Sequence, residues 1–145
     1  GEEATLFDDS FSAAVFSPEI GAELDDKLYL RVRRAEAVIP AAVATVTEDR
    51  GSNGEHVYTL GLRPSGPPLA GAPWTETVVV QVAPQNPSYA VLQGLGAQLV
   101  GTPVILFFRR YKGDGQVVVH WRAEPERPDV RQAVERARLL GELGK

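Results

Sequence analysis

The chain has 145 residues, of which none is cysteine or methionine and only two are histidine. Without cysteine there is no disulfide framework, thiol nucleophile or thiolate metal site. His56 and His120 stand outside any metal-ligand spacing. The sequence also lacks a phosphate-binding loop, a dinucleotide fingerprint and a nucleophile elbow. We therefore expect no catalytic residue, no bound metal and no cofactor, so that the protein is not an enzyme.

Positive charge is scarce at the start of the chain. Before Leu28 the only basic residue is Lys27, against eight acidic residues. Basic residues concentrate after Arg109, and the formal net charge is −4. This balance excludes a general attraction to nucleic acid or to an anionic membrane.

No charged residue lies between Thr77 and Phe108, but the prolines within this stretch, such as Pro84 and Pro87, argue against a transmembrane span. The chain starts at Gly1 without a methionine, which is typical of a mature or trimmed product. We expect a secreted or lipid-anchored protein of a bacterial envelope, located in the periplasm, with a cytoplasmic location as the alternative.

The stretch from Pro103 to Glu124 predicts two strands joined by a tight turn. Asp114 and Gly115 supply the positive φ angles that a short hairpin turn needs. The first strand is apolar on both faces: Val104, Leu106 and Phe108 on one, and Ile105, Phe107 and Tyr111 on the other. Such a strand is usually covered on both faces. We expect it to lie inside a closed wall of five strands.

The second strand of this hairpin has a different pattern. Its apolar residues Val117, Val119, Trp121 and Ala123 alternate with Val118, His120, Arg122 and Glu124. Alternation of this kind predicts one core face and one face in contact with solvent. We expect Arg122 and Glu124 on the solvent face.

Three further strands are predicted before the hairpin, over Ala35–Thr47, His56–Leu62 and Thr75–Val82. Pro40 interrupts the first of them, which fits an edge, a bulge or a bend. Leu28–Val32 fits either the last turns of a helix or a short strand. The stretch Arg63–Trp74 is rich in proline and glycine and is expected to be irregular.

Three helix starts are indicated. Ser17-Pro18-Glu19 has a capping serine followed by proline. Ser88 is expected to cap a second helix, with an apolar stripe of Tyr89, Leu92, Leu95 and Leu99. Asp129 and Gln132 predict a capping box for a third helix over Asp129–Leu143, with an inner side of Val130, Ala133, Val134, Ala137 and Leu140.

The order of these elements, three strands, a helix, two strands and a terminal helix, resembles the OB-fold, a small Greek-key barrel. The resemblance covers Ala35 to Glu124 and depends on element order alone; another small barrel or an α+β sandwich are the rival folds. It implies a mainly β fold of one domain with three parts: an acidic N-terminal arm or tether over 1–27, an OB-like barrel over 28–124, and a C-terminal helix over 125–145 packed on the barrel. The arm and the helix are then available to cover exposed strand faces, unless the arm is a flexible terminus.

OB-folds often bind single-stranded nucleic acid or oligosaccharide on their second and third strands. Here the outward residues of those strands include no aromatic side chain and only one basic side chain, Arg63. An alternative site is a cluster of cations with one aromatic residue: Arg109, Arg110, Tyr111, Lys112 and Arg122. These residues either bind an anionic partner or form a solvated strand end that pairs with local acids.

Trp74 is a second candidate, because tryptophan is favoured at the centres of interfaces. The alternative is that Trp74 caps the barrel core. Taken together, the sequence favours a non-catalytic binding or assembly module whose partner is another protein. The competing interpretation is a single-stranded nucleic-acid-binding OB domain that uses the basic cluster.

Overall fold

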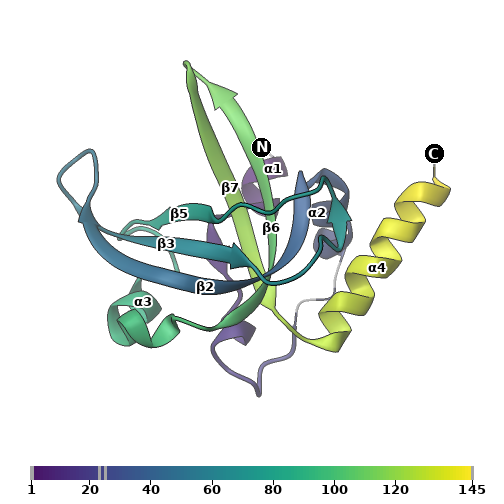
Figure 1. The fold of residues 1–145 in the computed structure, drawn as a ribbon, viewed down its shortest axis with the longest axis horizontal. Coiled ribbons are helices and arrows are strands. Elements are labelled where there is room, and N and C mark those ends of the chain that lie inside the picture. Colours follow the sequence, from purple (N-terminus) through teal and green to yellow (C-terminus); the bar gives the residue numbers. More distant parts are fainter. Residues whose placement is uncertain (1, 23, 25, 145) are drawn as a thin grey trace.

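One curled seven-stranded sheet forms the body of the protein (Figure 1). The computed structural model describes residues 2–22, 24 and 26–144. The strands are β1 (Ser10–Phe11), β2 (Ala37–Arg50), β3 (His56–Pro64), β4 (Ala70–Gly71), β5 (Val78–Val82), β6 (Pro103–Gly113) and β7 (Gln116–Pro125). The helices are α1 (Glu2–Leu6), α2 (Asp26–Arg34), α3 (Tyr89–Leu95) and α4 (Pro128–Leu143), with short 3₁₀ turns η1 (Ala13–Val15) and η2 (Gly96–Leu99).

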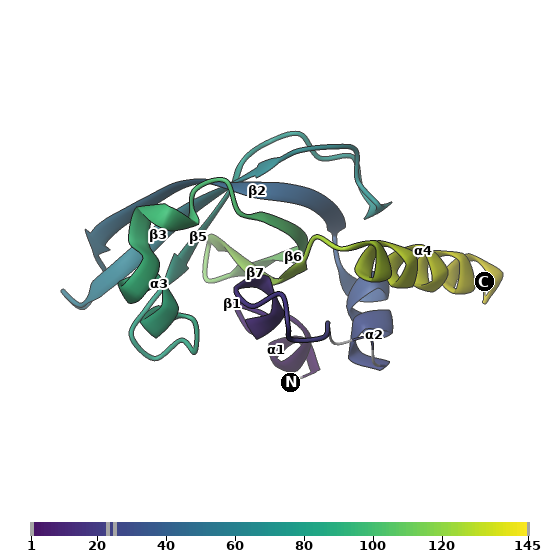
Figure 2. The same cartoon turned by 90° about the horizontal axis from the view of Figure 1, so that it is seen from below.

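The strands run in the order β1-β7-β6-β2-β3-β5, and β4 pairs with one end of β2. All pairs are antiparallel except β1 with β7, which is parallel. The sheet curls into a half-barrel, with α3 and α4 at opposite ends (Figures 1 and 2). The predicted class, mainly β with a C-terminal helix, is confirmed. The wall is open rather than closed: within the described residues, β5 and β7 share no ladder.

Strand β6 is buried on both faces, as its sequence predicts. Val104, Leu106 and Phe108 face the concave side and join the core residues of β2, β3 and β5. Ile105 and Phe107 face the other side and belong to a second core. Each of these five side chains has no exposed surface.

The second core is covered by segments from both ends of the chain. Leu6 and Phe7 come from the N-terminal segment, and Val130, Val134 and Ala137 from α4; Leu28 and Val32 of α2 complete the layer. In Figure 2 α1, α2 and α4 lie on the same side of the sheet. The N-terminal segment and the C-terminal helix, the two segments expected to cover an exposed strand face, therefore both pack over β6, and α2 is a third segment that does so. Burial of these apolar residues is the main force that holds α1, α2 and α4 on the sheet.

The prediction that Arg122 and Glu124 of β7 face solvent is wrong. Arg122 is only 9% exposed and Glu124 is 0% exposed, while Val117, predicted to face the core, is 57% exposed. The reason is that the layer that covers β6 also covers β7 from Trp121 to Pro125. Residues 116–119 of β7 lie beyond this layer, so Val117 and Val118 remain in solvent.

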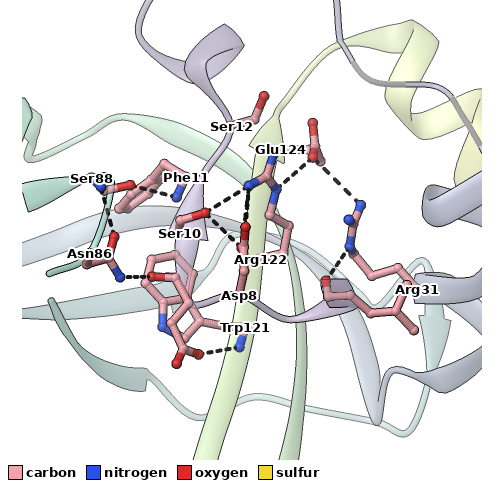
Figure 3. A network of polar contacts seen from close by, with 12 residues as sticks. Asp8, Ser10, Phe11, Ser12, Arg31, Asn86, Ser88, Trp121, Arg122 and Glu124 are labelled. Atoms are coloured by element: carbon pink, nitrogen blue, oxygen red, sulfur yellow. Dashed lines mark hydrogen bonds and ion pairs between the residues drawn. The ribbon is translucent and has the colours of Figure 1, made fainter. Parts of the chain in front are cut away.

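Glu124 is the centre of a buried polar network (Figure 3). Its Oε2 accepts a hydrogen bond from Arg122 Nε (3.1 Å) and lies 3.8 Å from Arg31 Nη1. Arg31 Nε in turn donates to the carbonyl of Leu6 (2.6 Å), and Arg122 Nη1 donates to Asp8 Oδ2 (3.1 Å). The network therefore joins β7, α2 and the N-terminal segment through charged groups, of which Arg31, Arg122 and Glu124 are buried.

Pro40 lies within β2 and not at an outer edge of the sheet. Its carbonyl accepts a hydrogen bond from Ser65 N (2.9 Å). In an extended strand the N and O of one residue point to the same side, so Pro40 N points away from β6 and into the gap where β3 ends at Pro64. No bond to β6 is lost. The bulge in β2 lies elsewhere, between Val43 and Thr45.

Helix starts were the least predictable features. Ser17-Pro18-Glu19 forms a turn in which Ser17 Oγ donates to Glu19, and the helix of this region is α2, which includes Leu28–Val32. Ser88 Oγ accepts a hydrogen bond from Phe11 N (3.0 Å) instead of capping α3. Helix α4 begins at Pro128, so that Asp129 lies inside its first turn and accepts from Val130 N. The expected inner residues Leu95 and Leu140 are exposed.

We expect Glu124→Ala to lower the free energy of unfolding by about 3–5 kcal/mol, because it leaves Arg31 and Arg122 buried without their shared carboxylate. Urea denaturation measures this change. Glu135→Ala is the matched control, since it removes a carboxylate from an exposed pair with Arg138 and should change stability by less than about 1 kcal/mol. Equal effects of the two substitutions would contradict the role given to Glu124.

Candidate functional site

The outer half of the β6–β7 hairpin extends beyond the rest of the sheet (Figure 1). The last β2 residue paired with β6 is Ala37, opposite Phe108, whereas the β6–β7 ladder continues to Gly113–Gln116. Asp114 and Gly115 turn the chain with φ angles of 49° and 78°, as the sequence predicts. We call the residues from Arg109 to His120 the hairpin arm.

A groove of about 570 Å³ lies between the hairpin arm and the end of α2. It is open to solvent and is lined mainly by cations. The basic lining residues are Arg33, Arg34, Arg109, Arg110 and Lys112; the others are Ala35, Glu36, Tyr111 and Val117. We call this site the basic groove. Five cations against one carboxylate make it strongly positive within a chain of net charge −4.

The carboxylate of Glu36 is held by Arg110. Arg110 Nε lies 3.0 Å from each oxygen of Glu36, Arg110 Nη2 forms a further close bond, and Arg110 N donates to Glu36 Oε1 (3.2 Å). Hydrogen bonds from the Arg110 guanidinium hold the pKa of the Glu36 carboxyl below its ordinary value, against the opposing effect of partial burial. The same bonds raise the pKa of Arg110.

Three other cations of the groove lack a carboxylate partner among the described residues. Arg33 donates to the hydroxyl of Tyr29 (3.1 Å), and Arg109 donates to the carbonyl of Arg34 (3.0 Å) and stacks on Tyr111, 5.6 Å from the ring centre. Lys112 is exposed. The direct contacts of these three side chains are therefore neutral, while Arg109 also lies near enough to Glu36 to help lower the pKa of that carboxyl.

The structure brings four of the predicted cluster residues into one groove, namely Arg109, Arg110, Tyr111 and Lys112. Arg122 is not among them, since it lies in the buried network with Glu124. Its side chain points to the face covered by the N-terminal segment. The five-residue patch expected from the sequence is therefore two separate sites.

Trp74 packs against the core at the edge of the groove. Its ring lies 4.9 Å from the ring of Phe108, and the guanidinium of Arg110 lies 4.8 Å from the centre of the Trp74 ring. Trp74 Nε1 donates to the carbonyl of Glu76 (2.9 Å). The tryptophan thus caps the core while it supports the arginine that binds Glu36.

Sequence reasoning missed Arg33, Arg34 and Glu36 as parts of this site. The signal was the group of arginines at positions 31, 33 and 34, with Glu36 two residues after the last of them. Since α2 ends at Arg34 and β2 begins at Ala37, this run lies at the point where the chain passes the hairpin arm. Nothing in the local sequence shows which strand it passes.

The two histidines both make side-chain contacts. His56 Nδ1 lies 2.9 Å from the hydroxyl of Tyr89, and His120 Nδ1 lies 3.0 Å from the carboxylate of Asp9. Within the part of the chain that the structure describes, no group of three or more His, Cys, Asp or Glu side chains is arranged to hold a metal ion.

The face expected to bind ligands in an OB-fold offers little for recognition. Val57 and Gly61 are buried, and Val79 on β5 is exposed with Gln81 beside it. Arg63 is the one basic residue among the outward positions predicted there. This face therefore supplies neither stacking aromatics nor a cluster of cations.

Comparison of the sequence with protein-family models and with curated proteins finds no match. Among the described helices, none has the length and apolar character that crossing a bilayer requires.

We expect the Glu36 carboxyl to titrate below 4.5 in an NMR pH titration, and its pKa to rise toward 4.5 in the variant Arg110→Gln. A lowered folded-state pKa means that the Glu36–Arg110 pair stabilises the protein above the unfolded value of 4.5, and that this contribution is lost as the pH falls through the folded value. The stability difference between wild type and Arg110→Gln should therefore shrink below pH 4.5.

Arg138→Gln is the control for this titration. It should raise the pKa of Glu135, which Arg138 lowers, and leave that of Glu36 unchanged. An unaltered Glu36 pKa in Arg110→Gln would show that Arg110 does not control this carboxyl.

Proposed function

We propose that this protein is a non-catalytic binding module that docks an acidic segment of a partner protein in the basic groove. The observation that carries the proposal is the charge of that groove, with five cations and one carboxylate in a chain that is acidic as a whole. A concentrated positive site on an acidic protein attracts anionic partners locally and leaves the remaining surface repulsive to them.

The contact between Glu36 and Arg110 supports the choice of a carboxylate ligand. Arg110 Nε donates to Oε1 and Arg110 Nη2 donates to Oε2 of Glu36, and such paired hydrogen bonds are the geometry in which arginine binds carboxylates most strongly. Arg33, Arg109 and Lys112 lie around this pair and are bound only to neutral groups or exposed. They are therefore available to the carboxylates of a partner.

An open groove between a helix end and a hairpin suits a chain segment better than a small molecule, which is usually enclosed by a deep and mostly apolar pocket. Val117 and Ala35 in the lining add apolar contact for the side chains between the acidic residues of such a segment. The groove thus offers charge for orientation and apolar surface for contact.

Single-stranded nucleic acid is the competing ligand, because the groove has both cations and an aromatic residue. Sequence-independent binding of single strands uses aromatic rings as stacking platforms. Tyr111 is the one aromatic ring among the groove's lining residues; the guanidinium of Arg109 lies over it and the ring of His120 is 5.3 Å away. These contacts restrict its use for stacking, so we favour the protein ligand.

The OB-like architecture is part of the same proposal. The sheet order β7-β6-β2-β3-β5 supports it, since an OB barrel pairs its first strand with the second and fourth, its second with the third, and its fourth with the fifth. We infer a barrel of this type that is opened between β5 and β7, where β1 pairs with β7.

A fluorescent decaglutamate peptide is a suitable probe of the groove. We expect it to bind the wild type, and the double variant Arg109→Glu/Lys112→Glu to weaken binding by roughly tenfold or more, a change of about 1.4 kcal/mol. Arg63→Glu is the control, because Arg63 is an exposed cation on β3, outside the groove. Fluorescence anisotropy measures both affinities.

Unchanged decaglutamate binding in the double variant, or no binding by the wild type, would contradict the proposal. The same assay with a single-stranded oligonucleotide tests the competitor. Affinity that falls steeply with salt and is abolished by Arg110→Glu would favour the nucleic-acid ligand.

A further inference from the structure

The outer edge of β7 presents unpaired backbone groups. In a two-residue hairpin the pairs Gly113–Gln116 and Tyr111–Val118 exchange hydrogen bonds, so the N–H and C=O groups of the residues between them point outward. On β7 this residue is Val117, and Val119 is the next outward residue after Val118. The same alternation continues down the strand, where Trp121 O accepts a hydrogen bond from Asp9 N (2.7 Å).

Asp9 ends the pairing of the N-terminal segment along this edge. Its backbone has φ 60°, which turns the chain away from β7, and its Oδ1 accepts a hydrogen bond from Trp121 N (3.1 Å). The Asp9 carboxylate thus takes the place of a backbone carbonyl as the acceptor for the N–H of Trp121. Among the described residues, none is hydrogen-bonded to the outward backbone groups of Val117 or Val119.

This edge lacks the features that keep edge strands from associating. Natural edges usually carry a charge, a proline or a bulge. Residues Gln116 to Val119 have none of these, and the side chains of Val117 and Val118 are 57% and 43% exposed. The opposite edge of the hairpin arm is different, because there Arg110 and Lys112 carry charge and Glu36 binds Arg110 N.

We propose that two copies of this chain associate through this edge, with β7 pairing antiparallel to β7 of the second copy about a two-fold axis at Val118. A two-fold interface requires a surface that is complementary to itself. Here Val117 lies opposite Val119 of the second copy and exchanges two hydrogen bonds with it. The symmetric pair exchanges two more.

The side chains on both faces fit this arrangement. Val117 and Val119 point to one face of the hairpin arm, so the two copies form a row of four valines there. On the other face Val118 meets Val118 of the second copy, with Tyr111 beside each, since Tyr111 is the cross-strand neighbour of Val118. The rows themselves contain no charged side chain; Lys112 and Arg110, the β6 partners of Val117 and Val119, flank the row of four valines on its outer sides.

The distribution of charge favours association through β7 over association through β6, the other strand of the hairpin arm. Antiparallel pairing through β6 would place Lys112 opposite Arg110 of the second copy, and like charges in direct cross-strand contact are destabilising. Pairing through β7 leaves these cations one strand away from the contact, beside Val119 and Val117 of their own copy. The contact involves few residues and lies below the size of standard interfaces, so the association is weak and depends on concentration.

Sedimentation velocity of the full chain over a range of concentrations tests the proposal. We expect a monomer–dimer equilibrium in the wild type and a rise of the dissociation constant by roughly tenfold or more in Val119→Pro. Proline removes the outward N–H, and it leaves the hairpin bonds intact because Val119 N does not point to β6. Val118→Lys is a second variant, which places two like charges at the axis.

Val79→Lys is the matched control, because Val79 is an exposed valine (60%) on the other edge strand, β5. It should leave the dimer unchanged, as should Arg33→Glu, a groove substitution on α2 rather than on the hairpin arm. Failure of the dimer proposal is thereby distinct from failure of the groove proposal. Circular dichroism shows whether each variant keeps the fold. A wild type that is monomeric up to its solubility limit overturns the proposal, as does a dimer that both Val119→Pro and Val118→Lys leave intact.

Discussion

The structure depends on the burial of β6 on both faces. A strand with five consecutive large apolar residues cannot leave either face in water, so the chain must build two cores. The curled sheet supplies the first, and helices from opposite ends of the chain supply the second. This constraint explains why the N-terminal segment, α2 and α4, which are far apart in sequence, form one layer (Figure 2).

The second layer has an unusual component, a buried ion network at its margin. Glu124, Arg122 and Arg31 are desolvated at a cost that a single ion pair would hardly offset, and the cost is met by several hydrogen bonds at once. Charged groups of this kind are directional, whereas apolar contacts are not. We interpret the network as the feature that fixes the position of the N-terminal segment and of α2 against β7 (Figure 3).

The surface features follow from where neighbouring strands stop. β2 reaches only to Ala37 and β1 is only two residues long, so among the described residues the outer part of the β6–β7 hairpin has no neighbouring strand on either side. On the β6 side, the end of α2 and Glu36 create the basic groove. On the β7 side, Asp9 closes the ladder and leaves the valine edge. Two carboxylates, Glu36 and Asp9, thus mark the points where the sheet ends and the hairpin arm begins.

The sequence by itself determined the features that depend on local pattern. These are the two-sided burial of Val104 to Phe108, the hairpin turn at Asp114-Gly115, the inner faces of β3 and β5, and the approximate extent of α4. Four residues of the predicted cluster, Arg109 to Lys112, line one groove because they are neighbours in one strand. Only the tertiary structure decided that Arg122 and Glu124 are buried, and that Arg33, Arg34 and Glu36 belong to the groove. The physical reason is that alternation records the side of a strand on which a residue lies, while its environment there is set by charges and helices more than 70 residues away in the chain.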